Sequence, residues 1–274
     1  MKKQERVTAG AVVGAIVLVG ALVTVSVLSA QNAGRKRLQQ LQVAQVEQLA
    51  RGMNTRIDQA FTSFQGLVAA PPPFHATLRD RSDAARLKVL QDLQPSATSG
   101  MLLVDRSGTV TNGTLLRDPS SVGRRLERPG LDAVLAGQAS VLPVAAGITT
   151  TEPTIALAYP LKSAAGTVIG AFVFESGVTT TSSFNQEIAQ LGGAKNADYA
   201  FVDSTGKVVA SNNVALLAKQ FDSRVTGTSA TGVRRTGGDL LVTEAVPSAQ
   251  WRMVFRQPVH DFEGSLTDPI RSLR

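Results

Sequence analysis

The residues able to carry chemistry are few and widely spaced. The 274-residue chain has two histidines, His75 and His260, and no cysteine. His75 follows a triple proline and His260 lies near the carboxyl end, so a Ser-His-Asp arrangement would have to use a peripheral histidine. Paired histidines, thiolates and a dense carboxylate loop are absent from the sequence, and metal sites are built from such groups. We therefore expect no catalytic residues, no metal and no cofactor.

Two related turns carry acidic residues. Val104-Asp105-x-x-Gly108-x-Val110 recurs 98 residues later as Val202-Asp203-x-x-Gly206-x-Val208. Aspartate at the head of such a turn normally binds its own backbone, so we assign these residues to structure. The recurrence predicts two related units. Gly237-Gly238-Asp239 is typical of a hairpin turn, because no lysine and helix start follow it.

The amino-terminal segment predicts a membrane anchor. Residues 1–6 form a basic tip, and residues 7–30 carry no charge over 24 positions. A helix of that length spans ~36 Å, enough for a hydrocarbon core of ~30 Å. A cleaved signal peptide is the alternative, but its apolar region normally runs ~7 to 15 residues. The basic tip favours a cytoplasmic start, so we expect a single-pass cell-membrane protein with its bulk outside the cytoplasm.

A long amphipathic helix should follow as a stalk over residues 31–70, since apolar residues recur at threes and fours until Pro71. Its stripe either packs on the adjoining domain or dimerises. We expect a homodimer through this long helix, and Gly10 and Gly14 in the predicted membrane helix are spaced so that two such helices could approach closely.

The remaining chain predicts an α+β fold of two units. We place a membrane-distal unit at 71–180, a linking helix at 181–196, a membrane-proximal unit at 197–262, and a segment leading back to the membrane at 263–274. A helix near 83–94 should begin with Ser82 as its N-cap. Ile155, Leu157 and Tyr159 alternate with small residues, which predicts a central strand ended by Pro160 and antiparallel to residues 167–175.

A resemblance to a known family rests on several short motifs in a fixed order. They are Val122-Gly123, Arg128-Pro129, a helix at Leu131 to Ala136 before Gly137, Ala156 to Pro160, and Ala165-Gly166-x-Val168-Ile169-Gly170. Together they resemble the double Cache family, the extracytoplasmic sensor modules of bacterial receptors, over about Gln31 to Phe262. The resemblance implies two PAS-like units with mixed sheets on a membrane-leading helix.

The resemblance also points to a ligand site. Members that bind amino acids read Arg-Pro-Trp-Tyr after the first hairpin and use a later aspartate for the ligand's amino group. Here Arg128 and Pro129 match, Gly130 and Leu131 replace the aromatics, and no aspartate occurs between residues 141 and 159. The candidate ligand-binding residues are Arg128, whose fork could hold a carboxylate, with Leu131 and Tyr159. The alternatives are a surface arginine paired with Glu127 or Asp132, and a core tyrosine.

Two functions of different classes remain open. One is a membrane-anchored sensor that binds a small molecule, such as a carboxylate, in the distal unit and transmits through the long helix. The other is a ligand-free envelope scaffold that keeps the fold without the pocket. Nucleic-acid binding is not expected, because the formal charge of +7 is dispersed among acidic residues and no recognition motif accompanies it.

Overall fold

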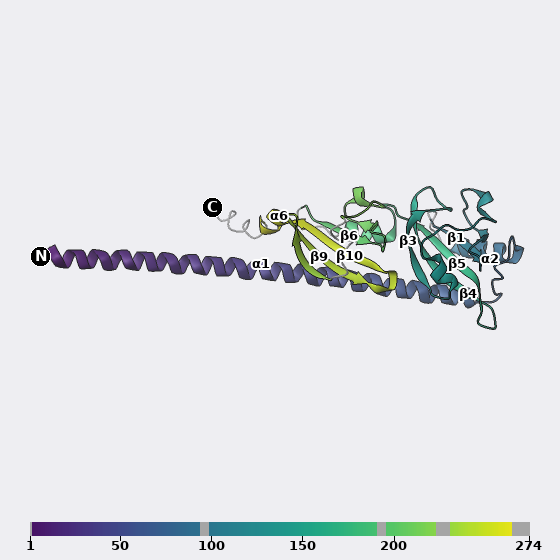
Figure 1. Cartoon of the computed structure of the whole chain (residues 1–274), viewed down its shortest axis with the longest axis horizontal. Helices are drawn as coiled ribbons and strands as arrows, with labels where there is room; N and C mark the ends of the chain where they lie inside the picture. Colours follow the sequence, from purple (N-terminus) through teal and green to yellow (C-terminus); the bar gives the residue numbers. More distant parts are fainter. Residues whose placement is uncertain (1, 94–98, 191–195, 223–230, 265–274) are drawn as a thin grey trace.

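One long helix carries two small β-sheet units in a row along its side (Figure 1). The computed structural model describes residues 2–93, 99–190, 196–222 and 231–264, with side chains from residue 33 onward except at 35, 183, 184, 187 and 264. The helix, α1, runs from Lys2 to Ala69. The first unit lies at its carboxyl-terminal end and the second lies nearer its amino-terminal end.

Helix α1 packs through an apolar stripe. Val46, Ala50, Met53 and Ile57 recur at threes and fours and are all buried against the two units. The predicted membrane span at 7–30 falls where the side chains lie outside the described residues. No helix with described side chains combines the length and apolar content needed to cross a membrane.

The end of α1 is held by an arginine from the next helix. Arg86 on α2 donates to the carbonyls of Ala70, at 2.7 Å, and Pro72, while its guanidinium lies 3.9 Å from the centroid of the Phe74 ring. A cation beside free carbonyls is favourable at a helix carboxyl terminus. Helix α2 runs from Arg81 to Leu93.

The N-cap prediction for α2 was wrong by two residues. Asp80, not Ser82, caps the helix: its Oδ1 accepts from the backbone N–H groups of Ser82 and Asp83 at 2.8 and 3.1 Å. The Ser82 hydroxyl also donates to this carboxylate and contributes most to stabilising its ionised form. Together with the two backbone bonds it lowers the pKa of Asp80 from 3.8 to about 2.

The first unit is a five-stranded sheet in the order β2-β1-β5-β4-β3. Its strands are β1 (Ser99–Asp105), β2 (Val110–Gly113), β3 (Ser140–Ala146), β4 (Pro153–Lys162) and β5 (Val168–Gly177). Between β2 and β3 lie the short helices η1 (Pro119–Ser121) and α3 (Leu131–Leu135).

The second unit repeats this arrangement in the order β7-β6-β10-β9-β8. Its strands are β6 (Asp198–Val202), β7 (Val208–Ser211), β8 (Gly232–Thr236), β9 (Asp239–Val246) and β10 (Trp251–Pro258). Its helical segments are η2 (Val214–Leu216), η3 (Pro247–Ala249) and α6 (Val259–Gly264), and α4 (Ser183–Ala189) precedes it. The two-unit α+β fold is confirmed, whereas the unit boundaries in the sequence stay a prediction.

Two expectations about the sheets need correction. Every strand pair among the described residues is antiparallel, so the sheets are not mixed. Strand β4 also continues through Pro160 instead of ending there. Its neighbour β3 begins at Ser140 opposite Ala158, so Pro160 has a partner strand on one side only, where a missing N–H is tolerated.

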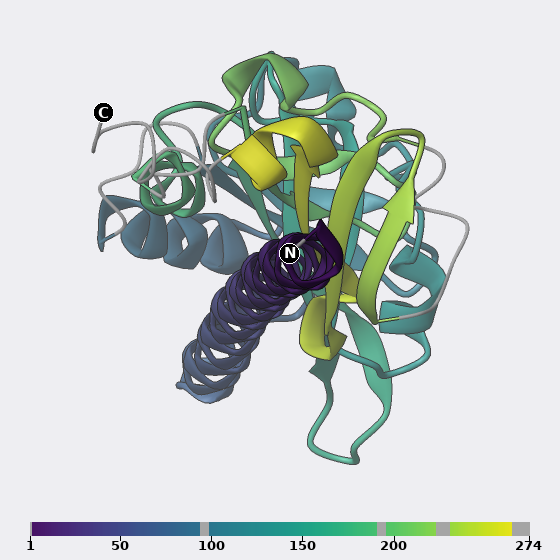
Figure 2. The same ribbon diagram turned by 90° about the vertical axis from the view of Figure 1, so that its left-hand side faces the viewer.

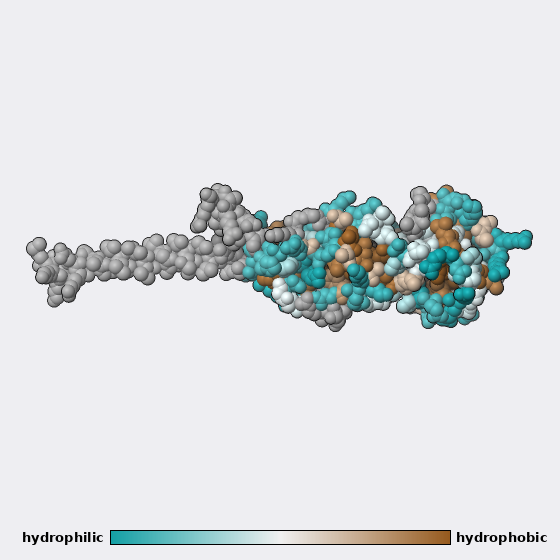
Figure 3. Space-filling view, turned by 90° about the horizontal axis from the view of Figure 1, so that it is seen from above, coloured by the Kyte–Doolittle hydropathy of each residue, from teal (hydrophilic) through white to brown (hydrophobic). Residues whose placement is uncertain are grey.

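Each sheet has one face toward α1 and one face away from it. In the first unit Ile155, Leu157 and Phe172 belong to the core shared with α1, while Ala156 and Val173 belong to a separate core against α3. In the end-on view the long helix runs toward the viewer beside the strands (Figure 2). From above, hydrophilic side chains interrupted by apolar patches cover both units (Figure 3).

Candidate functional site

The site is centred on a buried charge on the α3 side of the first sheet. Arg128 precedes α3, and its side chain is 1% exposed. Its Nη1 donates to Glu175 Oε1 at 2.7 Å and to Thr154 Oγ1 at 2.8 Å, while Nη2 donates to the carbonyls of Thr154 and Pro143 at 2.5 and 3.3 Å. Arg128 is therefore not the surface arginine of the alternative interpretation. Asp132, one of the two partners suggested there, pairs with Arg125 at 3.0 Å.

Glu175 comes from the middle of the sheet and is fully buried. It lies on β5 opposite Ala156 of β4. Its second oxygen, Oε2, accepts from the backbone N–H groups of Ile148 and Thr149, both at 3.1 Å, and from Thr149 Oγ1 at 2.9 Å. The loop between β3 and β4 thus folds over the carboxylate.

Burial and pairing act on Arg128 in opposite directions. Burial lowers the pKa of the guanidinium from its ordinary value, and the charge and hydrogen bond of Glu175 offset part of that change. The Nε–H of Arg128 is buried and has no hydrogen-bond partner among the described residues. A buried donor without an acceptor costs about 1–3 kcal/mol. The centre thus contains one buried donor that no described residue satisfies.

The structure brings two of the three predicted site residues to the same side of the sheet. Leu131 begins α3, is buried, and packs with Leu142 and Val134 on the side where Arg128 lies. Tyr159 pairs with Phe172, which belongs to the core facing α1. Because opposite residues of an antiparallel pair share a face, Tyr159 points toward α1, away from Arg128. The three residues do not converge on one pocket.

A cavity of about 330 Å³ lies beside this centre. It is formed between the segment after β2 and the β3–β4 loop, and its charged lining residues are Arg117, Arg124, Arg125 and Glu127. Ile148, which lines it, also donates to Glu175. Asp132 pairs with Arg125 at 3.0 Å and Glu127 is part of the lining, so acidic groups balance part of the positive charge of the three arginines.

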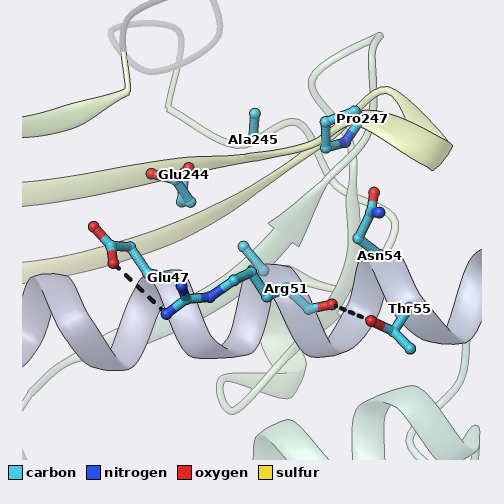
Figure 4. A pocket seen from close by; sticks show the side chains of 8 residues that line it. Glu47, Arg51, Asn54, Thr55, Glu244, Ala245 and Pro247 are labelled. Atoms are coloured by element: carbon cyan, nitrogen blue, oxygen red, sulfur yellow. Dashed lines mark hydrogen bonds and ion pairs between the residues drawn. The ribbon is translucent and has the colours of Figure 1, made fainter.

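Another cavity of about 430 Å³ lies between α1 and β9. Figure 4 shows Glu47, Arg51 and Asn54 on the helix facing Glu244 and Pro247 across it. Glu47 and Arg51 form an exposed ion pair at 3.8 Å, and Glu244 is the third charged residue of the lining. This cavity lacks a buried charged group of the kind found at Arg128.

One cluster has the composition of a metal site but is committed to structure. His75, Asp80 and Asp83 bring their ligand atoms within 4.8 Å of one another. Both carboxylates are already used, since Asp83 accepts from the backbone N–H groups of His75 and Ala76 and Asp80 caps α2. Helix capping by Asp80 and the loop contacts of Asp83 account for the geometry.

Glu175 is the site residue that sequence reasoning missed. The family pattern predicts an aspartate within residues 141–159, whereas the carboxylate partner of Arg128 is a glutamate on the next strand. Its signal was a single acidic residue inside the apolar run Val168 to Val178. Charged residues in buried strands are rarely unpaired, so Glu175 called for a basic partner.

Comparison with known proteins supports the fold and the family. A family model described as a Cache domain matches residues 28–266. Among solved structures, the ligand-binding domain of Mlp24 with asparagine has a TM-score of 0.63 at 14% identity, over 85% of this chain and 98% of the other. The amino acid chemoreceptor PctC from Pseudomonas aeruginosa PAO1, in complex with GABA, has a TM-score of 0.59 at 15% identity, over 80% and 99%.

A third structure is longer than the matched region. The extracellular ligand binding receptor from Desulfohalobium retbaense has a TM-score of 0.58 at 17% identity, over 77% of this chain but 40% of the other. No curated protein matches the sequence. At these identities the structural likenesses establish the fold.

Proposed function

The chain belongs to the Cache domain family, and from that premise we propose that it is an extracytoplasmic sensor whose first unit binds a small zwitterionic or carboxylate ligand at Arg128 and Glu175. The observation that carries the proposal is the buried Arg128–Glu175 pair, whose Nε–H has no hydrogen-bond partner among the described residues. Buried ion pairs add little stability compared with apolar residues of similar volume. A functional reason for keeping both charges is therefore favoured.

The chemistry of the pair suits a ligand that carries both charges. A carboxylate can take the Arg128 fork together with the free Nε–H, and an ammonium group can take the place of the fork at Glu175. A zwitterion would thus separate the pair and satisfy both halves. The solved neighbours with asparagine and with GABA make such amines the first compounds to test. Arg117 and Arg124 line the cavity that also includes Ile148, and we propose this cavity as the entry for a carboxylate.

Ligand binding would also move the loop that covers Glu175. Ile148 and Thr149 donate to the glutamate oxygen that faces away from Arg128. When a ligand takes over Arg128, Glu175 is free to shift and the loop can follow it. A ligand selects between two such states only through its difference in affinity for them.

Membrane attachment and dimerisation belong to the same proposal. The uncharged run at 7–30 is part of α1, and Leu41 further along that helix is 58% exposed. A membrane anchor predicts that the full chain stays in the membrane fraction after alkaline carbonate extraction. Dimerisation through α1 predicts efficient cross-linking of the Leu41→Cys variant in membranes. Release of the chain by carbonate would contradict the membrane anchor, and absence of the cross-linked species would contradict the dimer.

The decisive experiment is a thermal-shift series with the full chain, L-asparagine, γ-aminobutyrate and succinate. A ligand at ~100 times its dissociation constant adds ~2.7 kcal/mol to stability. We expect a shift with wild type that is lost in Glu175→Gln and retained in Asp132→Asn, which breaks an exposed ion pair of the same unit. Absence of any shift across a broad set of amines and carboxylates would favour the ligand-free scaffold.

A further inference from the structure

The two units are joined at a bulge in strand β3. The pairing of β3 with β4 shifts between Leu142 and Ala145, so Pro143 and Val144 have no partners on β4. Their main-chain groups make bonds elsewhere. The carbonyl of Pro143 accepts from Arg128, while the N–H and carbonyl of Val144 bind residues of the second unit.

Asp203 supplies the main contact from the second unit. Its Oδ2 accepts from the Val144 N–H at 2.7 Å, and Lys207 Nζ donates to the Val144 carbonyl at 3.2 Å. Asp203 and Val144 are both buried. A charge-assisted bond of this length in a buried setting is among the stronger hydrogen bonds in proteins.

Asp105 provides an internal comparison. In both turns the aspartate Oδ1 accepts from two backbone N–H groups, at 2.8 and 2.9 Å for Asp105 and at 2.8 and 3.0 Å for Asp203. The turn of the first unit uses its carboxylate for its own loop, whereas the turn of the second unit also reaches across to β3. The same motif therefore has an added role in one of its two copies.

We propose that Asp203 is a positioning residue for the ligand site: from the second unit it fixes the β3 bulge whose adjacent carbonyl holds Arg128. The bulge links Asp203 to Arg128 through consecutive residues, since Pro143 binds Arg128 and Val144 binds Asp203. The description of Arg128 as a ligand residue rests on the proposed function. The mechanical coupling of Asp203 to Arg128 does not depend on it.

The contact between the two units also reaches helix α1. Strand β3 packs against η3, the turn between β9 and β10. In η3, Ser248 donates its N–H to Asn54 Oδ1 at 2.9 Å and its hydroxyl to Asp58 Oδ1 at 2.6 Å. Asn54 is seen beside Pro247 in Figure 4. A continuous set of contacts thus runs from Arg128 through β3 to α1.

The test compares Asp203→Asn with Asp105→Asn in the full chain. Asparagine keeps an oxygen for the turn but presents an N–H₂ group to Val144, so the substitution selectively breaks the bond between units. We would measure the rate at which phenylglyoxal modifies each arginine, with Arg86 as the reference for general opening. We expect modification of Arg128 to rise about tenfold in Asp203→Asn, with Arg86 unchanged, and neither rate to change in Asp105→Asn.

An Arg128 rate within twofold of wild type in Asp203→Asn would overturn the proposal. If both arginines became equally reactive, the variant would have unfolded, and Lys207→Met would decide. That variant removes the second bond to Val144 and leaves the turn intact, so a selective rise at Arg128 supports the coupling and an unchanged rate refutes it.

Ligand titration separates this proposal from the function. Weaker binding of L-asparagine or γ-aminobutyrate by Asp203→Asn than by Asp105→Asn supports the positioning role, and equal binding refutes it. If wild type binds neither compound, the ligand assignment fails, while the reactivity of Arg128 still decides the coupling.

Discussion

Replacing Glu175 with glutamine should destabilise the first unit strongly. The substitution keeps the shape of the side chain and removes its charge, which leaves the guanidinium of Arg128 buried with its side chain 1% exposed. Breaking a buried pair by removing one partner costs about 3–5 kcal/mol, and the glutamine N–H₂ would in addition face donors on one side. At roughly 2–4 °C per kcal/mol, the melting temperature should fall by at least about 6 °C.

The assay is urea unfolding of the full chain, followed by circular dichroism, for Glu175→Gln, Asp132→Asn and a double variant. Asp132 pairs with Arg125 at 3.0 Å, but the two side chains are 85% and 54% exposed, so its loss should cost under about 1 kcal/mol. The double variant Arg128→Met with Glu175→Leu should recover most of the stability, because it removes both charges together.

Two results would refute the reasoning. A loss of unfolding free energy below about 1 kcal/mol for Glu175→Gln would mean that the guanidinium of Arg128 is in contact with water in solution. The pair would then not be buried as the structure has it. A double variant as unstable as the single one would show that packing, and not the unpaired charge, accounts for the loss.

Three further predictions follow from the fold. The pKa of Asp80 in the folded protein lies near 2, below its ordinary 3.8, so its ionised form stabilises the protein above about pH 4, and this contribution disappears as the pH falls through about 2. Asp80→Asn should therefore lower the unfolding free energy at pH 7. In acid titrations the difference from wild type should vanish near pH 2. Arg86→Met should cost roughly 1.5–3 kcal/mol in urea unfolding, because it withdraws charged hydrogen bonds from the end of α1, and a neutral effect would contradict that role. Gly170→Ala should prevent normal folding, since a Cβ there would lie 2.1 Å from the Val104 carbonyl oxygen, whereas Gly52→Ala on the open face of α1 should raise stability by about 1 kcal/mol; equal expression and melting of the two variants would contradict the packing.

The sequence contained most of the fold because local patterns specify it. The stripe on α1, the repeated Val-Asp-x-x-Gly-x-Val turns and the alternation in β4 each depend on neighbouring residues, and the structure confirms them as elements. Pro160 and Ser82 were misjudged for a shared reason. Whether a proline ends a strand depends on how far the adjacent strand extends, and the choice of N-cap depends on where the backbone turns.

The candidate site was less accessible because its residues meet only in three dimensions. Arg128 and Glu175 are 47 positions apart, and their pairing depends on which face of β5 the glutamate occupies. For Tyr159 the difficulty was to predict which face of the sheet its side chain occupies. Alternation establishes that β4 has two faces, but it does not say which of them α1 covers.

The unbroken length of α1 has a mechanical consequence. At ~1.5 Å per residue its 68 residues form a rod of about 100 Å, held along one side by two sheets. The part of α1 that precedes the sheets, from Lys2 to Leu38, is about 54 Å long, so a tilt of about 2° at the sheets displaces its far end by about 2 Å. Rearrangement on the scale of a single side chain at β3 or η3 is thereby amplified by leverage, without any change in the helix itself.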